Sequence, residues 1–490
     1  MSNRRFYILL AFATLFLNAY PLCQFVKTGG LLYYTNAFDE TSYLQYDFSV
    51  LAQTRTRAAQ YLVTFAHNMG LSGGAINLLF DFIAIGLCPL FASWAFVEAG
   101  FDRRTANLNA FLLTFLPLAF GGLNPSIQRL FSLNLSTGAI YWVTMPEASF
   151  LPLVRSPEPQ FSLTLLSIAA YFSLKRKSFL YTYLCVPFMY PFVALPVAFI
   201  VVSLHVRQIF RRSPRWLPMI PLAAFFAITV PLWLYLNNSI TTSDATRAFL
   251  VPTHLPLISF TAGISLVIVL FAFREYPPTY RFVAAVVALA PLAVANQQVI
   301  TGWLAQPNNF EQYAGVFCAT FVTLMAVRGR WVGTALVVTA LVLVVHSSYL
   351  TFQKNELLNQ KLVLTDELLE QLRTDSPHVA INDVELAAVC SLMFPRQPPT
   401  MFGMQKTFLQ MCSEEYVHQY LCSRSRITAD ESLANDYRKV LEELDHGYRH
   451  EWTDFVLSHI GRRSSFDVNH PIEDVPFDRD FPELHFVKLR

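Results

Sequence analysis

The chain has 490 residues, of which 54% are hydrophobic and only 14% are charged, and its mean hydropathy is +0.38. Soluble domains carry about 25% charged residues, so this composition predicts a membrane protein over much of its length. The formal net charge of +2 indicates no nucleic-acid role. The lipid bilayer is therefore the first expected partner.

The first apolar span covers residues 6–26 and follows Arg4 and Arg5. Positive residues favour the cytoplasmic side, so the span is expected to begin there and to leave the cytoplasm. No small-residue cleavage site follows it, so we predict a retained membrane helix rather than a signal peptide.

Two adjacent carboxylates, Asp39 and Glu40, follow this first span at the membrane surface. Ionisable groups beside a bilayer are costly to desolvate, which makes this pair a functional candidate. The alternative is that Asp39 caps the next helix and Glu40 complements its dipole. Apolar residues then recur at helical spacing up to Phe65, which predicts an amphipathic surface helix within an extracytoplasmic loop of residues 27–70.

Further apolar spans alternate with basic turns, which the same rule places in the cytoplasm. The predicted spans cover residues 75–97, 108–120, 161–174, 216–236, 257–273, 282–295, 312–327 and 332–349. One apolar run, 179–204, has a basic turn at each end although it is long enough for only one crossing of about 20 residues. Because Pro187 and Pro191 interrupt its middle, we predict a hairpin of two short helices entered from the cytoplasmic side.

The predicted fold class is an α-helical polytopic membrane protein with about eleven crossings, the hairpin included. Residues 1–352 form its membrane domain. From residue 353 the composition becomes that of a soluble protein, and short strands are expected at 379–382 and 400–403. Residues 353–490 are therefore predicted to form a small extracytoplasmic α/β domain.

Most residues that could carry chemistry lie in the predicted outer loops. Arginine binds phosphate oxygens, and a carboxylate accepts a hydroxyl proton, so the set suits a phosphate-bearing substrate and a hydroxyl nucleophile. The predicted catalytic residues are Asp39 and Glu40. The substrate-binding candidates are Arg129, Glu147, Arg155, Arg247, His254, Asn296, Gln297, Gln298 and Thr301.

Each candidate also has a structural alternative. The arginines could contact lipid headgroups, and the amides at 296–298 could cap a helix. His254, beside prolines, could be a plain loop residue. Asp81 stands alone in a span and is left unassigned, because it could pair with a neighbouring helix or belong to a pore.

The retained first span, the loop segment Phe38-Asp39-Glu40-Thr41-Ser42-Tyr43-Leu44 and the surface helix together resemble the GT-C superfamily of polytopic glycosyltransferases. The short-helix hairpin and the outer soluble part are similar to that superfamily as well. The resemblance covers the membrane part, from Arg5 to about Tyr349.

The resemblance implies transfer of a hexosyl or pentosyl group from a polyprenyl-phosphate donor to a glycan, lipid or protein acceptor. Asp39 would be the general base, with Glu40 beside it, in the bacterial inner membrane as part of cell-envelope synthesis. No cofactor is assigned. No obvious metal triad stands out, which argues against metal-dependent oligosaccharyl transfer, and a divalent metal is kept only as an alternative.

Two other classes of function are kept as alternatives. A transporter or flippase-like protein would use the hairpin as its substrate gate, although the basic turns and loop lengths do not repeat between the halves. A receptor or scaffold that binds a partner through the tail would need no carboxylates at the membrane surface.

Overall fold

The computed structural model describes residues 1–27, 57–117, 119, 141–143, 153, 158–211, 220–232, 250–252, 254, 256–301, 303–305, 307–327, 329–364, 379–381, 400–401, 435 and 486–488. Within these residues four helices are long and apolar enough to cross a membrane, at 3–27, 73–98, 191–210 and 331–353. Shorter apolar helices lie at 222–232, 260–272 and 280–295. The chain is therefore a helical membrane protein, as its composition predicts.

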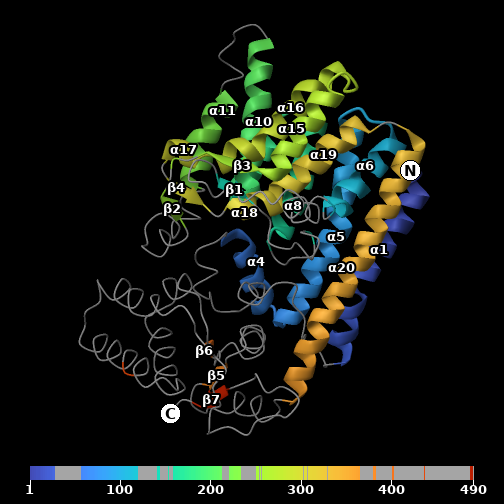
Figure 1. The fold of residues 1–490 in the computed structure, drawn as a ribbon, viewed down its shortest axis with the longest axis vertical. Helices are drawn as coiled ribbons and strands as arrows, with labels where there is room; N and C mark the ends of the chain where they lie inside the picture. The colour runs from blue at the N-terminus through green and yellow to red at the C-terminus, as the bar shows by residue number, and fades with distance from the viewer. Residues whose placement is uncertain are drawn as a thin grey trace.

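The helices form two packed groups (Figure 1). The first is built around α5 (Gly73–Glu98), which packs against α1 (Asn3–Lys27), α6 (Arg103–Phe115) and α8 (Gln160–Lys175). The second group consists of α15 (Phe260–Ala272), α16 (Pro278–Ala295) and α19 (Val316–Ala326). The helix α10 (Pro191–Arg211) contacts α8 and α16 and so joins the two groups.

Residues assigned by sequence to the cytoplasmic side gather at one end of this bundle. The N-terminal ammonium group donates to the carbonyl of Arg104 at 2.5 Å, and the Tyr280 hydroxyl donates to the carbonyl of Ala99. The Arg207 guanidinium lies over the Phe282 ring at 4.2 Å. The ends of α1, α5, α10 and α16 that carry basic residues are therefore neighbours.

Asp102 begins α6 at this end. Its carboxylate accepts hydrogen bonds from the backbone N–H groups of Arg104 and Thr105, at 2.9 and 3.2 Å, and from the Thr105 hydroxyl at 2.5 Å. These bonds favour the charged carboxylate, the Thr105 side chain most, and lower the pKa of Asp102. The predicted span 108–120 thus starts earlier, because an N-cap precedes its apolar part.

A reversal of the chain is present where it was predicted, but its second arm is not a short helix, because α10 is long enough to cross a membrane. After α8 the chain turns into α9 (Leu180–Cys185) and the 3₁₀ turn η2 (Val186–Phe188), and Met189 is extended before α10 begins. The Ser173 and Thr182 hydroxyls lie 2.8 Å apart near the basic turn, whereas Tyr190 N donates to Ser162 Oγ at 2.6 Å. The chain from Thr182 to Tyr190 therefore runs antiparallel to α8 and reaches the first turn of α8.

The surface helix α4 (Arg57–Asn68) packs on α5 through Val63, Ala66 and Ile76. Its apolar Phe65 is 62% exposed, as expected of a helix that faces lipid. The polar side chain of Gln60 in this helix is buried.

The remaining apolar spans are not regular α-helices throughout, because π-helical turns or short strands occur at or near their ends. The segment from 220 begins as α11 (Ile220–Ala224) and continues as the π-helix η4 (Phe225–Thr229). Strand β3 (Leu257–Ser259) precedes α15 and pairs in parallel with β1 (Tyr141–Val143). The last part of the second group contains α17 (Gln298–Thr301), α18 (Pro307–Phe310) and the π-helix η5 (Glu311–Gly315). Strand β2 (Leu250–Pro252) pairs antiparallel with β4 (Trp303–Ala305).

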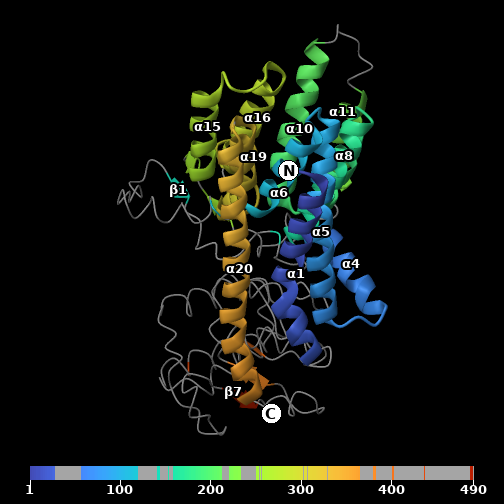
Figure 2. The same cartoon turned by 90° about the vertical axis from the view of Figure 1, so that its right-hand side faces the viewer.

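The last long helix, α20 (Arg330–Leu364), runs beside α1 along one edge of the bundle (Figures 1 and 2). It continues through Gln353 without a break, so the change to a soluble composition falls inside a helix. The two predicted tail strands are present as β5 (Val379–Ile381) and β6 (Thr400–Met401). They pair in parallel, and β7 (Phe486–Lys488) joins β5 on its other side.

Candidate functional site

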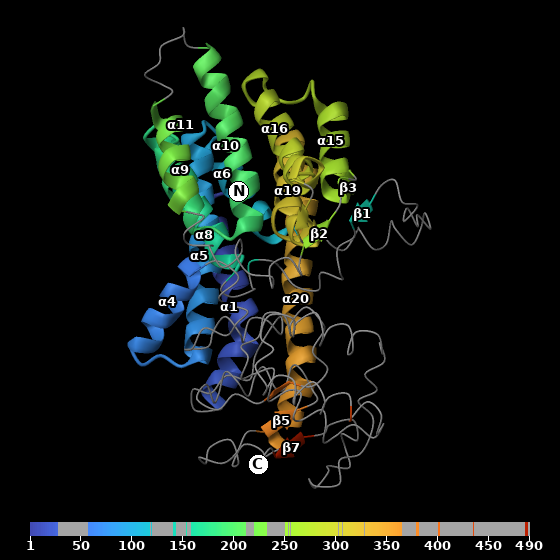
Figure 3. The same cartoon turned by 90° about the vertical axis from the view of Figure 1, so that its left-hand side faces the viewer.

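Several helices begin at the end of the bundle opposite the basic turns. These are α8, α10, α15 and the continuous run of α18, η5 and α19 (Figure 3). Helix α15 starts beside strand β3. Helix N-termini carry unsatisfied N–H groups and a partial positive charge. Three carboxylates are buried at this level, namely Asp81, Glu158 and Glu311, with exposed fractions of 1%, 3% and 2%.

Asp81 projects from the third turn of α5 and is paired with α8. The side-chain amide of Gln160, the first residue of α8, donates to Asp81 Oδ1 at 2.6 Å and to the carbonyl of Leu153 at 2.8 Å. Of the two alternatives for Asp81, the structure supports pairing with a neighbouring helix. A single amide thus fixes the carboxylate, the start of α8 and the chain at Leu153.

Glu158 belongs to a second network, which holds the hairpin tip. The Ser162 hydroxyl donates to Glu158 Oε2 at 2.7 Å and accepts from the backbone N–H of Tyr190 at 2.6 Å. The ring of Tyr190 is 1% exposed and meets the Tyr313 ring edge-on, with 5.6 Å between centroids. The hairpin tip is therefore anchored on one side to α8 and on the other to η5.

Glu311 is the first residue of the π-helix η5 and faces α15. Its Oε2 accepts hydrogen bonds from the backbone N–H of Thr261 at 3.2 Å and from the Thr261 hydroxyl. A Cβ on Gly315 would overlap the Thr261 hydroxyl and lie 3.1 Å from Glu311 Oε2, so only glycine allows this close approach. The extra residue of a π-turn is a frequent feature of functional sites.

We expect Ser162→Ala to destabilise the folded protein by about 2–4 kcal/mol, since two buried polar groups lose one hydrogen bond each. Thermal unfolding in detergent measures the effect as a lower Tm. Thr339→Ala is the matched control, because its exposed hydroxyl bonds to the carbonyl of Ala335 in its own helix. Equal Tm values for the two variants would show that the Ser162 bridge does not anchor the hairpin.

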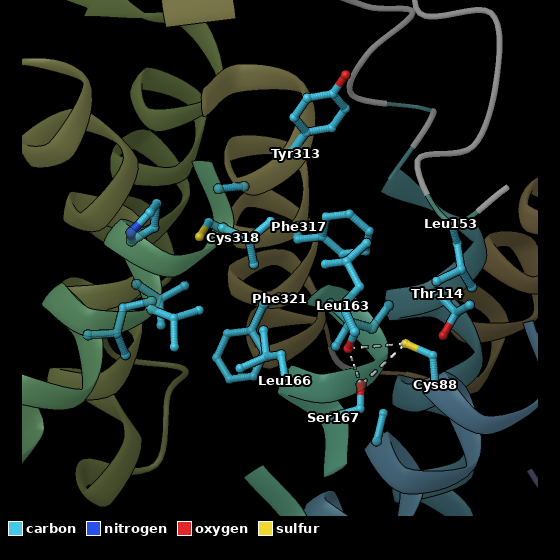
Figure 4. Close-up of a pocket in the computed structure, with 18 residues that line it drawn as sticks. Cys88, Thr114, Leu153, Leu163, Leu166, Ser167, Tyr313, Phe317, Cys318 and Phe321 are labelled. Atoms are coloured by element: carbon cyan, nitrogen blue, oxygen red, sulfur yellow. Dashed lines mark hydrogen bonds between the residues drawn. The ribbon is translucent and has the colours of Figure 1, made fainter. Parts of the chain in front are cut away.

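An apolar cavity of about 170 Å³ lies among these helices, and Figure 4 shows the side chains that line it. Its walls come from α5, α6, α8, α10, α16, η5 and α19. The polar atoms on its wall are largely used within the protein, as the Cys88 thiol contacts the Ser167 hydroxyl at 3.2 Å. The lining residues include Cys88, Ala92, Leu153, Leu163, Val197, Tyr313, Phe317, Cys318 and Phe321.

The level at which Asp81, Glu158 and Glu311 are buried is called the polar level below. Two residues belong both to this polar level and to the cavity wall. Leu153 accepts the Gln160 hydrogen bond through its carbonyl while its side chain lines the cavity. Tyr313 contacts Tyr190 of the hairpin tip and also lines the cavity. Buried carboxylates and an apolar chamber are therefore adjacent, an arrangement that fits the polar head and hydrocarbon chain of one amphiphilic molecule.

The predicted catalytic pair and four of the nine predicted binding residues fall outside the described part of the chain. They are Asp39, Glu40, Arg129, Glu147, Arg155 and Arg247. The segment 28–56, which carries the pair, joins α1 to α4, and both of these helices pack on α5. The roles assigned to these six residues stay predictions.

The candidates in the described residues lie around the end of α16. Asn296 Oδ1 accepts from Leu257 N at 2.6 Å, and its Nδ2 donates to the carbonyls of Leu257 and Leu292, at 2.9 and 2.8 Å. This amide therefore fastens β3 to α16. Gln298 is buried and donates to Asn296 Oδ1 at 3.4 Å, whereas Gln297 is half-buried.

His254 and Thr301 lie in the same region. His254 is exposed, and its Nδ1 lies 3.2 Å from the carbonyl oxygen of Val299. Thr301 is the last residue of α17. In the part of the chain that the structure describes, no three His, Cys, Asp or Glu side chains group as ligands for a metal ion.

The sequence did not single out Glu158, Glu311 or Thr261, and it left Asp81 unassigned. A charge inside an apolar span was the available signal for Asp81, and Glu311 at the edge of a span carried a weaker form of it. The partners could not be found this way, because Gln160 is 79 residues from Asp81. Pairing at that separation depends on how the helices pack.

Comparison of the chain with protein-family models, with curated proteins and with solved structures found no match in any of the three.

Proposed function

We propose that this protein is a membrane glycosyltransferase that takes a sugar from a polyprenyl-phosphate carrier and passes it to an acceptor on the extracytoplasmic side. The observation that carries the proposal is the adjacency of buried carboxylates and an apolar cavity, with Leu153 and Tyr313 common to both. A lipid-linked sugar has one polar end and one hydrocarbon end. Its two parts match these two environments.

The proposed reaction needs a base for the acceptor and a stabiliser for the leaving group. Asp39 takes the proton of the acceptor hydroxyl, and that oxygen forms a bond to the anomeric carbon. The bond from the anomeric carbon to the phosphate oxygen breaks, and the electron pair leaves with the prenyl phosphate. Arg155 or Arg247 steadies the negative charge on that phosphate, and the sugar is transferred with inversion.

A cavity of this size accommodates a short part of a hydrocarbon chain. An engineered apolar cavity of about 150 Å³ in another protein stays dry and binds benzene, so about 170 Å³ corresponds to a few carbon atoms of a prenyl chain. The rest of a long carrier would extend into the bilayer. Binding of this segment would place the phosphate end near the polar level.

A transporter that uses the hairpin as a gate is the second candidate, because the structure contains the broken helix that such a gate would need. Opening the gate would break the Tyr190–Ser162 hydrogen bond and expose a buried ring. Reconstituted proteoliposomes separate the two functions. A transporter would move labelled lipid-linked sugar across the bilayer without an acceptor, whereas a transferase would convert it to product.

Filling the cavity tests the proposal. We expect Ala92→Leu to weaken binding of the prenyl-phosphate sugar by about 10–100-fold, because about three buried CH₂ groups of ligand are displaced at about 0.8 kcal/mol each. Ala293→Leu is the matched control, since it makes the same change at an exposed site on α16. Transfer rates at varied donor concentration in proteoliposomes give the KM.

The variant must remain folded for this comparison, so its Tm is measured beside that of the wild type. Transfer by Ala92→Leu with an unchanged donor KM would contradict the assignment of the cavity to the donor chain. Absence of transfer by the wild type with every prenyl-phosphate sugar tested, together with acceptor-independent transport, would favour the second candidate.

A further inference from the structure

One face of α5 runs from the cavity to the polar level and then beyond it. Asn77, Asp81, Cys88 and Ala92 lie within about 60° of one another around a helix that turns 100° per residue. Cys88 and Ala92 line the cavity, and Asp81 pairs with Gln160. Since α5 and α8 run in the same direction and Gln160 starts α8, Asn77 lies about 6 Å beyond that start.

The side chain of Asn77 is buried but makes no hydrogen bond. Its exposed fraction is 1%, and neither Oδ1 nor Nδ2 has a partner. A buried amide without partners costs folding free energy, and such groups are uncommon in native proteins. The neighbouring Asp81 has its carboxylate oriented by Gln160. Asn77 is thus an unsatisfied donor and acceptor one helical turn from a fixed acceptor.

We propose that Asn77 and Asp81 form the subsite that binds the hydroxyl groups of the transferred sugar. This inference rests on the proposed function and names the residues that would recognise its substrate. An amide can donate to one hydroxyl and accept from another, and a carboxylate accepts from a third. Neighbouring hydroxyls on a sugar ring present such donors and acceptors together, which a phosphate group alone does not.

The placement along α5 agrees with this assignment. Asn77 and Cys88 are separated by about 16 Å along the helix axis, with Asp81 between them. A ligand with its sugar at Asn77 and Asp81 would therefore direct its chain toward the cavity. Helix α4 packs on Ile76, next to Asn77 on α5.

The test uses Asn77→Leu, which keeps the volume of the side chain but removes its hydrogen-bonding groups. Full-length protein in nanodiscs is mixed with a prenyl phosphate, or with the same lipid carrying glucose, N-acetylglucosamine or arabinose. The difference in Tm between sugar-bearing and bare lipid reports sugar recognition. Asn18→Leu is the matched control, because Asn18 is also 1% exposed with an unpartnered Oδ1 but lies on α1.

We expect the wild type and Asn18→Leu to show an added Tm shift for at least one sugar lipid. In Asn77→Leu that added shift is lost and the affinity for the sugar lipid falls about tenfold, while the shift with bare prenyl phosphate remains. The ligand-free Tm of Asn77→Leu does not fall, because an unsatisfied amide is replaced by an apolar group. A merely structural Asn77 would leave the added shift intact.

The outcomes separate the inference from the function on which it rests. A retained sugar-dependent shift in Asn77→Leu overturns the subsite and leaves the proposed transferase standing. A wild type that responds equally to bare and sugar-bearing lipids overturns the subsite and also counts against sugar transfer. A wild type that responds to no prenyl lipid at all overturns both.

Discussion

Asp39→Asn is expected to lower the rate of sugar transfer by about 10²–10⁴-fold while changing the Tm little. The amide keeps the shape of the carboxylate but cannot accept the proton of the acceptor hydroxyl. Asparagine caps a helix nearly as well as aspartate, so if Asp39 only capped the helix predicted to follow it, the replacement would cost about 1 kcal/mol or less and leave the rate unchanged. Turnover of a prenyl-phosphate sugar by the purified variant measures the difference.

Glu40→Gln is the companion variant for this test, because it removes the neighbouring carboxylate and keeps its volume. A milder loss than in Asp39→Asn identifies Asp39 as the principal base, and the opposite order exchanges the two roles. Wild-type turnover by Asp39→Asn would end the catalytic assignment of Asp39. The structural proposals on α5 and the cavity would be unaffected by that result.

The largest expected effect on folding is that of Gly315→Ala. The added methyl group would overlap the Thr261 hydroxyl and lie 3.2 Å from Thr261 Cβ, so η5 must move away from α15. Because the movement also separates Glu311 from Thr261, we expect a loss of about 3 kcal/mol or more, seen as a low yield of folded protein. Size-exclusion profiles and thermal unfolding in detergent measure it.

Gly263→Ala is the matched control, since a Cβ there meets nothing within 4 Å. Alanine is favoured over glycine inside a helix by about 1 kcal/mol, so this control is expected to be neutral or stabilising. Adding Thr261→Ala to Gly315→Ala should restore part of the lost stability by removing the hydroxyl. If Gly315→Ala folds as well as Gly263→Ala, the close packing of η5 on α15 is wrong.

The helices and the chain reversal could be predicted because they depend on local composition. Apolar runs of the right length gave α1 and α5, and two like-signed basic turns around the Pro187–Pro191 segment required a reversal between them. The basic residues gather at one end for the same reason. Hydropathy and charge are properties of short segments, so they can be obtained from the sequence without knowing how the helices pack.

The contacts of the candidate site could not be predicted, because they depend on the rotation and register of each helix. The Asp81–Gln160 and Glu311–Thr261 pairs join segments 79 and 50 residues apart. The apolar periodicity of a span also does not show which side of the helix faces a cavity, because the lipid and the protein interior are both apolar.

Photolabelling with a prenyl phosphate that carries a diazirine near the phosphate end of its chain tests the central claim, that one amphiphile occupies the polar level and the cavity together. We predict that peptides containing Cys88 or Phe317, on two walls of the cavity, are labelled and that the sugar-bearing lipid competes for labelling. Ala92→Leu should lose this label, and Ala293→Leu should keep it. Label confined to exposed lipid-facing positions such as Leu270 and Phe271 would contradict the account.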